Sequence, residues 1–135
     1  MELNKEIIKS RIDIIERNLR EIKDISAQKS FTYRDELALK HALLECIEAC
    51  VDIANHIISV KGFRKAESYS DVFKVLEENG IIDKDLSERL QSMAKFRNVL
   101  VHRYANIDFN KIVEFSRKDI KDIEEFIKII LNLIK

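Results

Sequence analysis

The sequence has no proline and only two glycines, Gly62 and Gly80. Proline interrupts helices and glycine weakens them, so the expected elements contain few helix breakers. Isoleucine, leucine, lysine and glutamate are abundant instead. This composition favours an all-α fold, and a length of 135 residues suits a single domain that spans residues 1–135.

An excess of either charge is also lacking, because 24 Lys and Arg residues balance 24 Asp and Glu residues. Overall charge therefore gives no evidence for a nucleic-acid or membrane partner, and any attraction to phosphate must be local. No apolar run approaches the roughly 18 residues of a membrane span, and the first residues do not resemble a signal peptide. We expect a cytoplasmic protein without a membrane partner.

Cysteine is scarce as well, with only Cys46 and Cys50, four residues apart on one expected helix. No nearby spacing supplies the further partners that a metal site or a disulfide needs, so free, packed thiols in a reducing compartment are expected. Pairs of His, Cys, Asp and Glu show no recognised zinc or di-iron spacing either. We therefore expect neither a metal nor a cofactor.

Apolar residues recur at intervals of three and four, as in amphipathic helices. Capping residues support the expected boundaries: Thr32 with Asp35, and the single residues Asp83 and Asp108. The pattern predicts an antiparallel bundle of four long helices and one short helix. The expected spans are about 3–25, 33–61, 70–79, 84–104 and 109–134.

The helix expected at 33–61 is apolar over roughly 200° of its circumference, which suits either a central helix or one that also forms a dimer interface. Its remaining arc is polar. That arc is either a solvated stripe or a wall that faces a functional site. It holds His41, Glu45, Glu48, Asp52, Asn55 and His56.

Arg97 stands where the helix at 84–104 should carry an apolar residue, since Leu86, Leu90, Met93, Leu100 and Tyr104 complete the same 3-4 pattern. Desolvating an unpaired charge costs several kcal/mol, roughly. We therefore expect Arg97 to be an ion-pair partner or a site residue.

His102 and Tyr104 follow Arg97 closely. On one helix Tyr104 lies within roughly 20° of Arg97, but His102 is rotated by roughly 140°. Either the last turn loosens near His102, or a second copy of the chain supplies the missing group.

Arginine and histidine together suit the cleavage of RNA, in which the ribose 2′-hydroxyl attacks the adjacent phosphorus. Histidine can move the protons at neutral pH, and arginine offers a planar fork of donors to the phosphate oxygens. Tyr104 is expected to position the substrate. An Arg-x4-His spacing alone is weak evidence for this chemistry.

The run Arg97-Asn-Val-Leu-Val-His102-Arg-Tyr104 resembles the Arg-x4-His-x-Tyr pattern of HepT-like toxins in the HEPN superfamily. Similar segments precede it in that family's order, at 52–58, 68–73 and 78–82. The resemblance covers the chain from about residue 33 to its end.

This resemblance implies a HEPN-like homodimer whose motifs face a shared cleft. It implies a metal-independent endoribonuclease toxin of a type VII toxin–antitoxin pair, with Arg97 and His102 as catalytic residues. The partner it implies is a minimal nucleotidyltransferase antitoxin, which neutralises the toxin by AMPylation of the motif tyrosine, Tyr104. Candidates for supporting roles are Asp52, Asn55, His56 and Asn98.

Three alternatives remain open from the residues alone. One is a nucleotide- or partner-binding module without catalysis. Another is a plain structural bundle in which Arg97 forms a buried ion pair with Asp52. The third concerns the segment 61–70, where Lys61, Arg64 and Lys65 form either a solvated loop or a local phosphate-binding patch.

Overall fold

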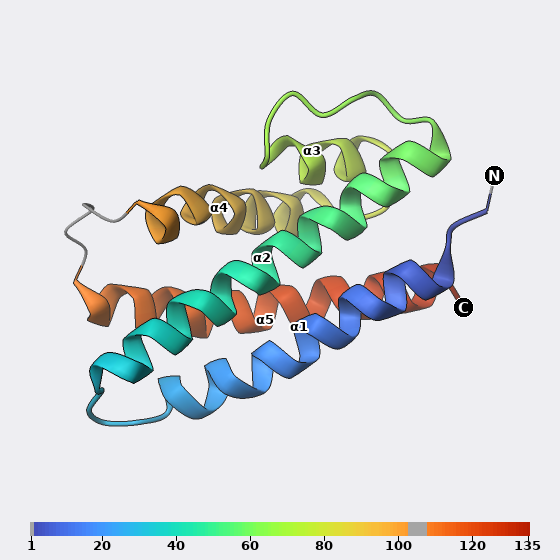
Figure 1. Cartoon of the computed structure of the whole chain (residues 1–135). Coiled ribbons are helices and arrows are strands. Elements are labelled where there is room, and N and C mark those ends of the chain that lie inside the picture. Colours follow the sequence, from blue (N-terminus) through green and yellow to red (C-terminus); the bar gives the residue numbers. More distant parts are fainter. Residues whose placement is uncertain (1, 103–107) are drawn as a thin grey trace.

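The computed structural model describes residues 2–102 and 108–135, and within them the chain forms five α-helices (Figure 1). The predicted all-α bundle of four long helices and one short helix is therefore confirmed. The helices are α1 (Lys5–Ser26), α2 (Tyr33–Lys61), α3 (Asp71–Glu78), α4 (Lys84–Val101) and α5 (Phe109–Leu133).

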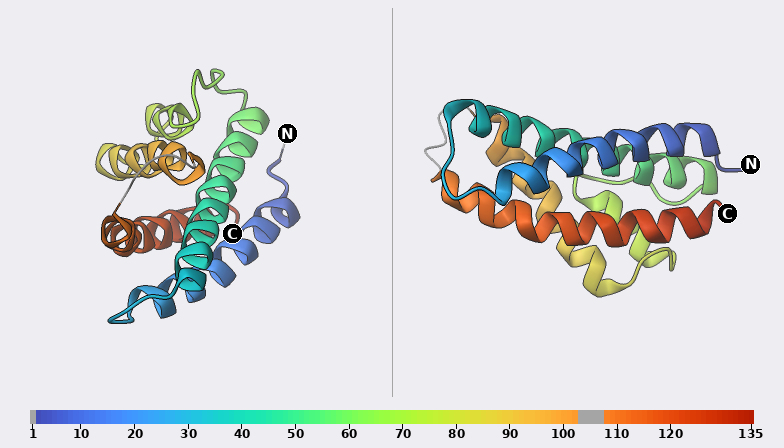
Figure 2. Two further views of the ribbon diagram at one scale, coloured as in Figure 1. Left: turned by 60° about the vertical axis from the view of Figure 1, so that its left-hand side comes forward. Right: turned by 90° about the horizontal axis from the view of Figure 1, so that it is seen from below.

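Helices α1 and α2 lie side by side, antiparallel to each other, and α4 and α5 form a second antiparallel pair behind them (Figures 1 and 2). The two chain ends lie at one end of the bundle, opposite the end where α4 finishes and α5 begins. None of the helices in the described part of the chain is long and apolar enough to cross a membrane.

Helix α2 is the central element, because it packs against each of the other four helices. Most of its two apolar stripes is buried within the protomer, including Leu43, Ile47 and Ile57, although Leu37 is 51% exposed. The predicted use of this wide band in a central helix is confirmed, and its use in a dimer interface stays a prediction.

The buried side chains form one continuous core. Phe73 of α3 meets Phe126 of α5 edge to face, with ring centroids 5.7 Å apart, and this joins the small helix to the bundle. Cys46 and Cys50 are free and buried in the same core, as predicted. Burial raises the pKa of the Cys46 thiol to about 12, so it packs as a small apolar group.

The helix ends use the capping residues that the sequence predicted. Thr32 and Asp35 form a capping box in which each side chain accepts a hydrogen bond from the other residue's backbone N–H. Asp83 accepts from the Leu86 N–H at 2.8 Å and so begins α4. The cap of α2 at Gly62 has φ 69°, a left-handed conformation that glycine adopts without strain.

Candidate active site

Arg97 lies in the last turn of α4, half-buried between α2 and the loop at 62–70. Its Nε is 3.6 Å from Oε1 of Glu48 on α2, and its guanidinium carbon is 4.8 Å from the centroid of the Tyr69 ring. A negative charge and an aromatic face therefore hold the cation from two sides. The expectation that Arg97 needs a partner is confirmed.

Contacts with Glu48 and Tyr69 hold the Arg97 side chain in position. Its Nε is buried and has no hydrogen-bond partner among the described residues, because 3.6 Å to Glu48 is too long for a hydrogen bond. The Arg97 side chain also interacts with Tyr69 and acts to lower the pKa of its hydroxyl. A guanidinium carries five N–H donors in a planar fork, which suits the oxygens of an incoming phosphate.

Tyr69 supplies the aromatic face under Arg97. Its hydroxyl is buried and lies close to the Arg97 side chain. Burial, and next the negative charge of Glu48, raise the pKa of Tyr69 to about 12, although Arg97 acts in the opposite direction. The ring therefore stays neutral at physiological pH. An attraction between cation and ring of about 0.5–2 kcal/mol is typical of such contacts.

His102 lies just beyond the end of α4 rather than within it. Its backbone N–H donates to the carbonyl of Asn98 at 3.2 Å, and its φ of −83° and ψ of 111° are extended. The helix predicted to continue to Tyr104 therefore ends at Val101, which corrects the expected span. The β-branched residues Val99 and Val101 disfavour a further helical turn.

The backbone at the end of α4 bears on whether the helix continues through His102. The predicted loosening of the helix end is confirmed, because His102 leaves the helical path five residues after Arg97. The other alternative, a group supplied by a second copy of the chain, stays a prediction. His102 is exposed at this end. Tyr104, the third member of the predicted motif, lies outside the described residues.

Two predicted supporting residues have other partners. Oδ2 of Asp52 accepts from Nε of Arg11 at 3.3 Å, and Nε2 of His56 accepts from the backbone N–H of Asn4 at 3.0 Å. Both contacts hold the N-terminal segment and α1 against α2. The alternative in which Asp52 forms an ion pair with Arg97 is therefore wrong, because Glu48, one turn earlier on α2, takes that place.

The residues on the polar arc of α2 have different surroundings. Glu48 faces Arg97, so this one position forms the wall that the arc was expected to supply. His41 is exposed and pairs with Glu45 at 3.0 Å along the helix. Asn55 on α2 and Asn98 on α4 are exposed.

The loop at 62–70 is fixed by Arg64. This side chain bonds to Asp71 at 2.7 Å and to Glu78 at 2.6 Å, and these bonds tie the loop to both ends of α3. The Arg64 guanidinium holds the pKa of the Asp71 carboxyl below its usual value. A phosphate patch that includes Arg64 is therefore wrong, because its donors are occupied, whereas Lys61 and Lys65 are exposed.

Sequence reasoning missed Tyr69 and did not single out Glu48. Glu48 was visible as a member of the polar arc, but its spacing resembles that of five other polar residues. Tyr69 lies within the segment 68–73 of the family resemblance, but in a loop without periodicity, so no pattern gave it a role. Within residues 2–102 and 108–135, no group of three or more His, Cys, Asp or Glu side chains is arranged to hold a metal ion.

Comparison with known proteins shows which family this chain belongs to. The model of the family described as "Ribonuclease HepT-like" matches residues 8–130. The chain belongs to the HepT-like ribonuclease family. The resemblance stated from the motif is thereby confirmed, and with it the HEPN-like fold and the ribonuclease class of enzyme.

Individual HepT-like proteins are similar over nearly their whole length. The mRNA nuclease HepT of Shewanella oneidensis is 33% identical over 130 residues, which are 93% of this chain and 96% of that protein. A crystal structure of a toxin–antitoxin with AMP-PNP has a chain that superimposes with a TM-score of 0.89 at 29% identity, covering 95% of this chain and 99% of that one.

A third similar structure is that of a tri-AMPylated Shewanella oneidensis HEPN toxin in complex with MNT antitoxin. Its matching chain has a TM-score of 0.87 and 30% identity, and the match covers 96% of this chain and 99% of that one.

Proposed function

We propose that this chain is the RNA-cleaving toxin of a toxin–antitoxin pair, with Arg97 and His102 as its catalytic residues and without a required metal ion. The observation that carries the proposal is the Arg97 guanidinium, held over the Tyr69 ring and beside Glu48, five residues before His102. We place this activity in the cytoplasm, where RNA is available and where Cys46 and Cys50 stay reduced.

In the proposed reaction the ribose 2′-oxygen attacks the adjacent phosphorus. His102 takes the 2′ proton, the bond from phosphorus to the 5′-oxygen breaks, and that oxygen receives a proton from an imidazolium. The products are a 2′,3′-cyclic phosphate and a 5′-hydroxyl. Arg97 donates to the non-bridging oxygens, on which negative charge builds up in the transition state.

A homodimer suits this chemistry, because one imidazole cannot take one proton and give another in the same step. His41 pairs with Glu45, and His56 accepts from Asn4, so neither is placed for this role. We propose that His102 of a second copy serves as the acid. Val101, which is 40% exposed beside the motif, gives this end of the molecule an apolar contact.

The proposed partner is a nucleotidyltransferase antitoxin that inactivates the enzyme at Tyr104. This proposal is supported by the motif and by the similar structure of a tri-AMPylated HEPN toxin in complex with MNT antitoxin. The tyrosine oxygen attacks the α-phosphorus of ATP, the bond to the β-phosphate breaks, and pyrophosphate and a proton leave. An AMP group beside Arg97 and His102 then fills the place of the RNA phosphate.

Two measurements test the proposal. Wild-type protein is expected to cleave mixed RNA equally well with and without EDTA, and loss of cleavage in EDTA would contradict metal independence. Intact-mass spectrometry after incubation with the antitoxin and ATP is expected to show added AMP on the wild type. Less AMP is expected on Tyr104→Phe, and equal labelling of both proteins would reject Tyr104 as an acceptor.

A further inference from the structure

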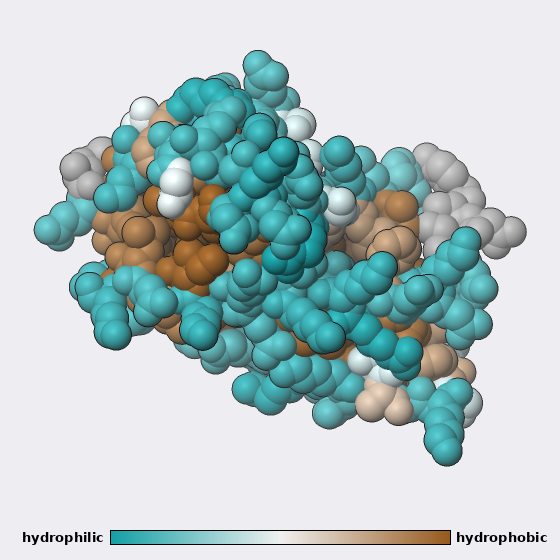
Figure 3. Space-filling model, turned by 180° about the vertical axis from the view of Figure 1, so that it is seen from behind, coloured by the Kyte–Doolittle hydropathy of each residue, from teal (hydrophilic) through white to brown (hydrophobic). Residues whose placement is uncertain are grey.

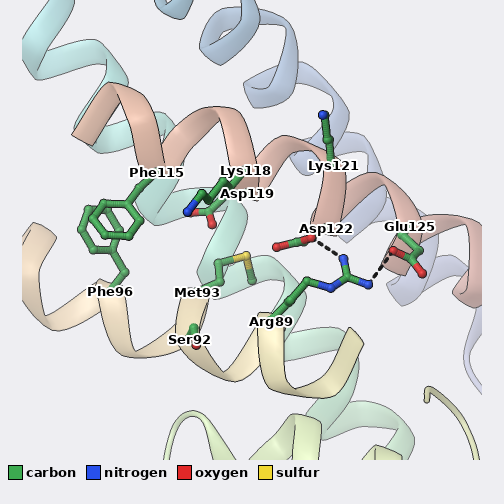
Figure 4. Close-up of a pocket in the computed structure, with 10 residues that line it drawn as sticks. All are labelled: Arg89, Ser92, Met93, Phe96, Phe115, Lys118, Asp119, Lys121, Asp122 and Glu125. Atoms are coloured by element: carbon green, nitrogen blue, oxygen red, sulfur yellow. Dashed lines mark hydrogen bonds and ion pairs between the residues drawn. The ribbon is translucent and has the colours of Figure 1, made fainter. Parts of the chain in front are cut away.

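A cavity of about 740 Å³ lies between α4 and α5 (Figure 4). Figure 3 shows the back of the molecule, where apolar side chains are visible among charged ones. The cavity begins at Phe96, the residue directly before Arg97, and it extends along α4 to Arg89. Its volume is in the range of small-molecule binding sites. The contacts that fix Arg97 do not include the residues that line this cavity.

The carboxyl group of Asp119 lies at the floor of the cavity and limits which ligand groups can bind there. Only 6% of this residue is exposed, and its Oδ2 is buried without a hydrogen-bond partner among the described residues. In Figure 4 its carboxyl group points from α5 toward α4, near the Met93 side chain. Buried polar atoms are nearly always paired, because leaving one unpaired is costly. This carboxylate is therefore arranged to accept hydrogen bonds from a ligand.

The charged neighbours of Asp119 limit which ligand fits. Arg89 does not neutralise it, because Arg89 is bonded to Asp122 and to Glu125. Lys118 lies beside Asp119, and its charge acts on the carboxyl group without a hydrogen bond between them. A cationic ligand would meet the like charge of Lys118. A neutral group with N–H donors, attached to an anion, would match both residues.

The other end of the cavity is aromatic. The rings of Phe96 and Phe115 are 4.7 Å apart between centroids and inclined by 38°, and Phe115 is 44% exposed. An exposed aromatic ring at the edge of a cavity is a surface on which a planar base can stack. Proteins that bind single strands commonly stack bases on aromatic side chains in this way.

We propose that this cavity binds a guanine base of the RNA substrate. The N1–H and the exocyclic amino group of guanine are adjacent donors, which match the two oxygens of the Asp119 carboxylate. Adenine and cytosine place a ring acceptor beside their amino group, and uracil has one donor between two acceptors. The base stacks on Phe115, and Lys118 contacts a phosphate.

This assignment rests on the proposed RNA cleavage and names a specificity determinant for it. Phe96 is five residues before the end of α4, which is roughly 7–8 Å along a helix axis. Arg97 follows Phe96 directly, with the two side chains roughly 100° apart around α4, so we assign the cavity to the base of a nucleotide near the cut. Guanine near the cut is the expected preference.

Binding of free nucleotides tests the pocket without cleavage. Guanosine and adenosine 5′-monophosphates are titrated into the full chain at pH 8 and followed by NMR or calorimetry. The wild type is expected to bind GMP at least about 10-fold more tightly than AMP, since a good bidentate contact contributes roughly 1–3 kcal/mol of discrimination. Equal affinities, or no binding of GMP, would overturn the proposal.

Two variants locate the contact. Asp119→Asn presents one acceptor and one donor, so it is expected to lose the preference for GMP, whereas the matched control Asp13→Asn on the exposed face of α1 keeps it. Phe115→Ala, at the surface, is expected to weaken both nucleotides alike and provides a second test if Asp119→Asn does not fold. An unchanged preference in Asp119→Asn, or unchanged affinities in Phe115→Ala, counts against the pocket.

Mapping of cut sites separates this proposal from the proposed function. Wild-type protein that cleaves RNA without regard to nearby guanine contradicts the pocket alone. A wild type that binds GMP selectively but cuts no RNA leaves the pocket in place and contradicts the proposed function. The expected result is cleavage near guanine by the wild type and a changed base preference for Asp119→Asn.

Discussion

Arg97 contributes geometry as well as charge, because Glu48 and the Tyr69 ring fix the plane of its guanidinium. Arg97→Ala is expected to lower RNA cleavage by roughly 10²–10³-fold, the usual effect of removing one transition-state donor. Arg97→Lys keeps the charge but loses the planar fork, so it should lose most of the activity too. Cleavage rates of both variants, with Arg20→Lys on the exposed face of α1 as a control, test this expectation. Full activity of Arg97→Lys would show that only the positive charge matters.

Asp119 is expected to lower the free energy of unfolding, and this effect can be measured. Burial, with Asp122 adding to it and Lys118 opposing it, raises the pKa of Asp119 from the ordinary 3.8 to about 7. The folded state therefore binds the proton more tightly than the unfolded chain, so stability declines as pH rises from about 4 to about 7.

Asp119→Asn removes this pH-dependent penalty. The variant is expected to be more stable than the wild type at pH 8, by up to roughly 4 kcal/mol, and to differ little at pH 4. Urea denaturation at the two pH values measures the difference, and Asp13→Asn serves as the exposed control. A wild type that is the more stable protein at pH 8 would show that the carboxylate is paired in solution.

Residue patterns predicted part of the site. The mismatch of Arg97 with its apolar neighbours correctly indicated a held cation, because periodicity registers a charge on a buried stripe. Asp52 was a wrong partner for it, since spacing along α2 does not say whether a carboxylate turns toward α1 or α4. The contact of Tyr69 with Arg97 was not predicted, because it depends on how a loop folds over the end of α4.

At the scale of elements, the loop at 62–70 positions the site through Tyr69, and Arg64 fixes that loop to α3. Arg64→Ala is expected to speed hydrogen exchange in the loop and to lower RNA cleavage several-fold. Lys65→Ala, which removes an exposed charge from the same loop, should leave both unchanged. Equal losses in the two variants would favour a phosphate-binding role for the basic loop over a positioning one.

The five helices could be predicted from sequence because periodicity and capping agree at nearly every boundary. Thr32, Asp83 and Asp108 each cap the helix that the apolar pattern starts. The end of α4 was misplaced because Leu100 continues the apolar pattern, while Val99 and Val101 and the extended backbone at His102 end the helix locally. The pattern records which face is apolar, but not where the last hydrogen bond forms.

For the whole molecule, the width of the apolar band on α2 is no longer sufficient ground for the proposed homodimer, because the other helices cover most of that band. It rests on the need for two imidazoles and on the exposed Val101 beside the motif. Light scattering at micromolar concentration is expected to give twice the chain mass of 15.9 kDa. Val101→Glu should give monomers with little activity, and Leu37→Glu, exposed on α2, should remain dimeric. A fully active wild-type monomer would contradict the shared site.

The central claim is that Arg97 and His102 cleave RNA, and His102→Ala tests it most directly. Purified wild type and His102→Ala are compared on the same mixed RNA in EDTA, with circular dichroism and thermal melting as checks of folding. His102 is exposed beyond the end of α4, so the variant is expected to keep its helicity and melting temperature. Its cleavage rate should fall by roughly 10²–10⁴-fold, the usual contribution of a general acid–base group. A folded His102→Ala protein that cuts RNA at the wild-type rate would contradict the account.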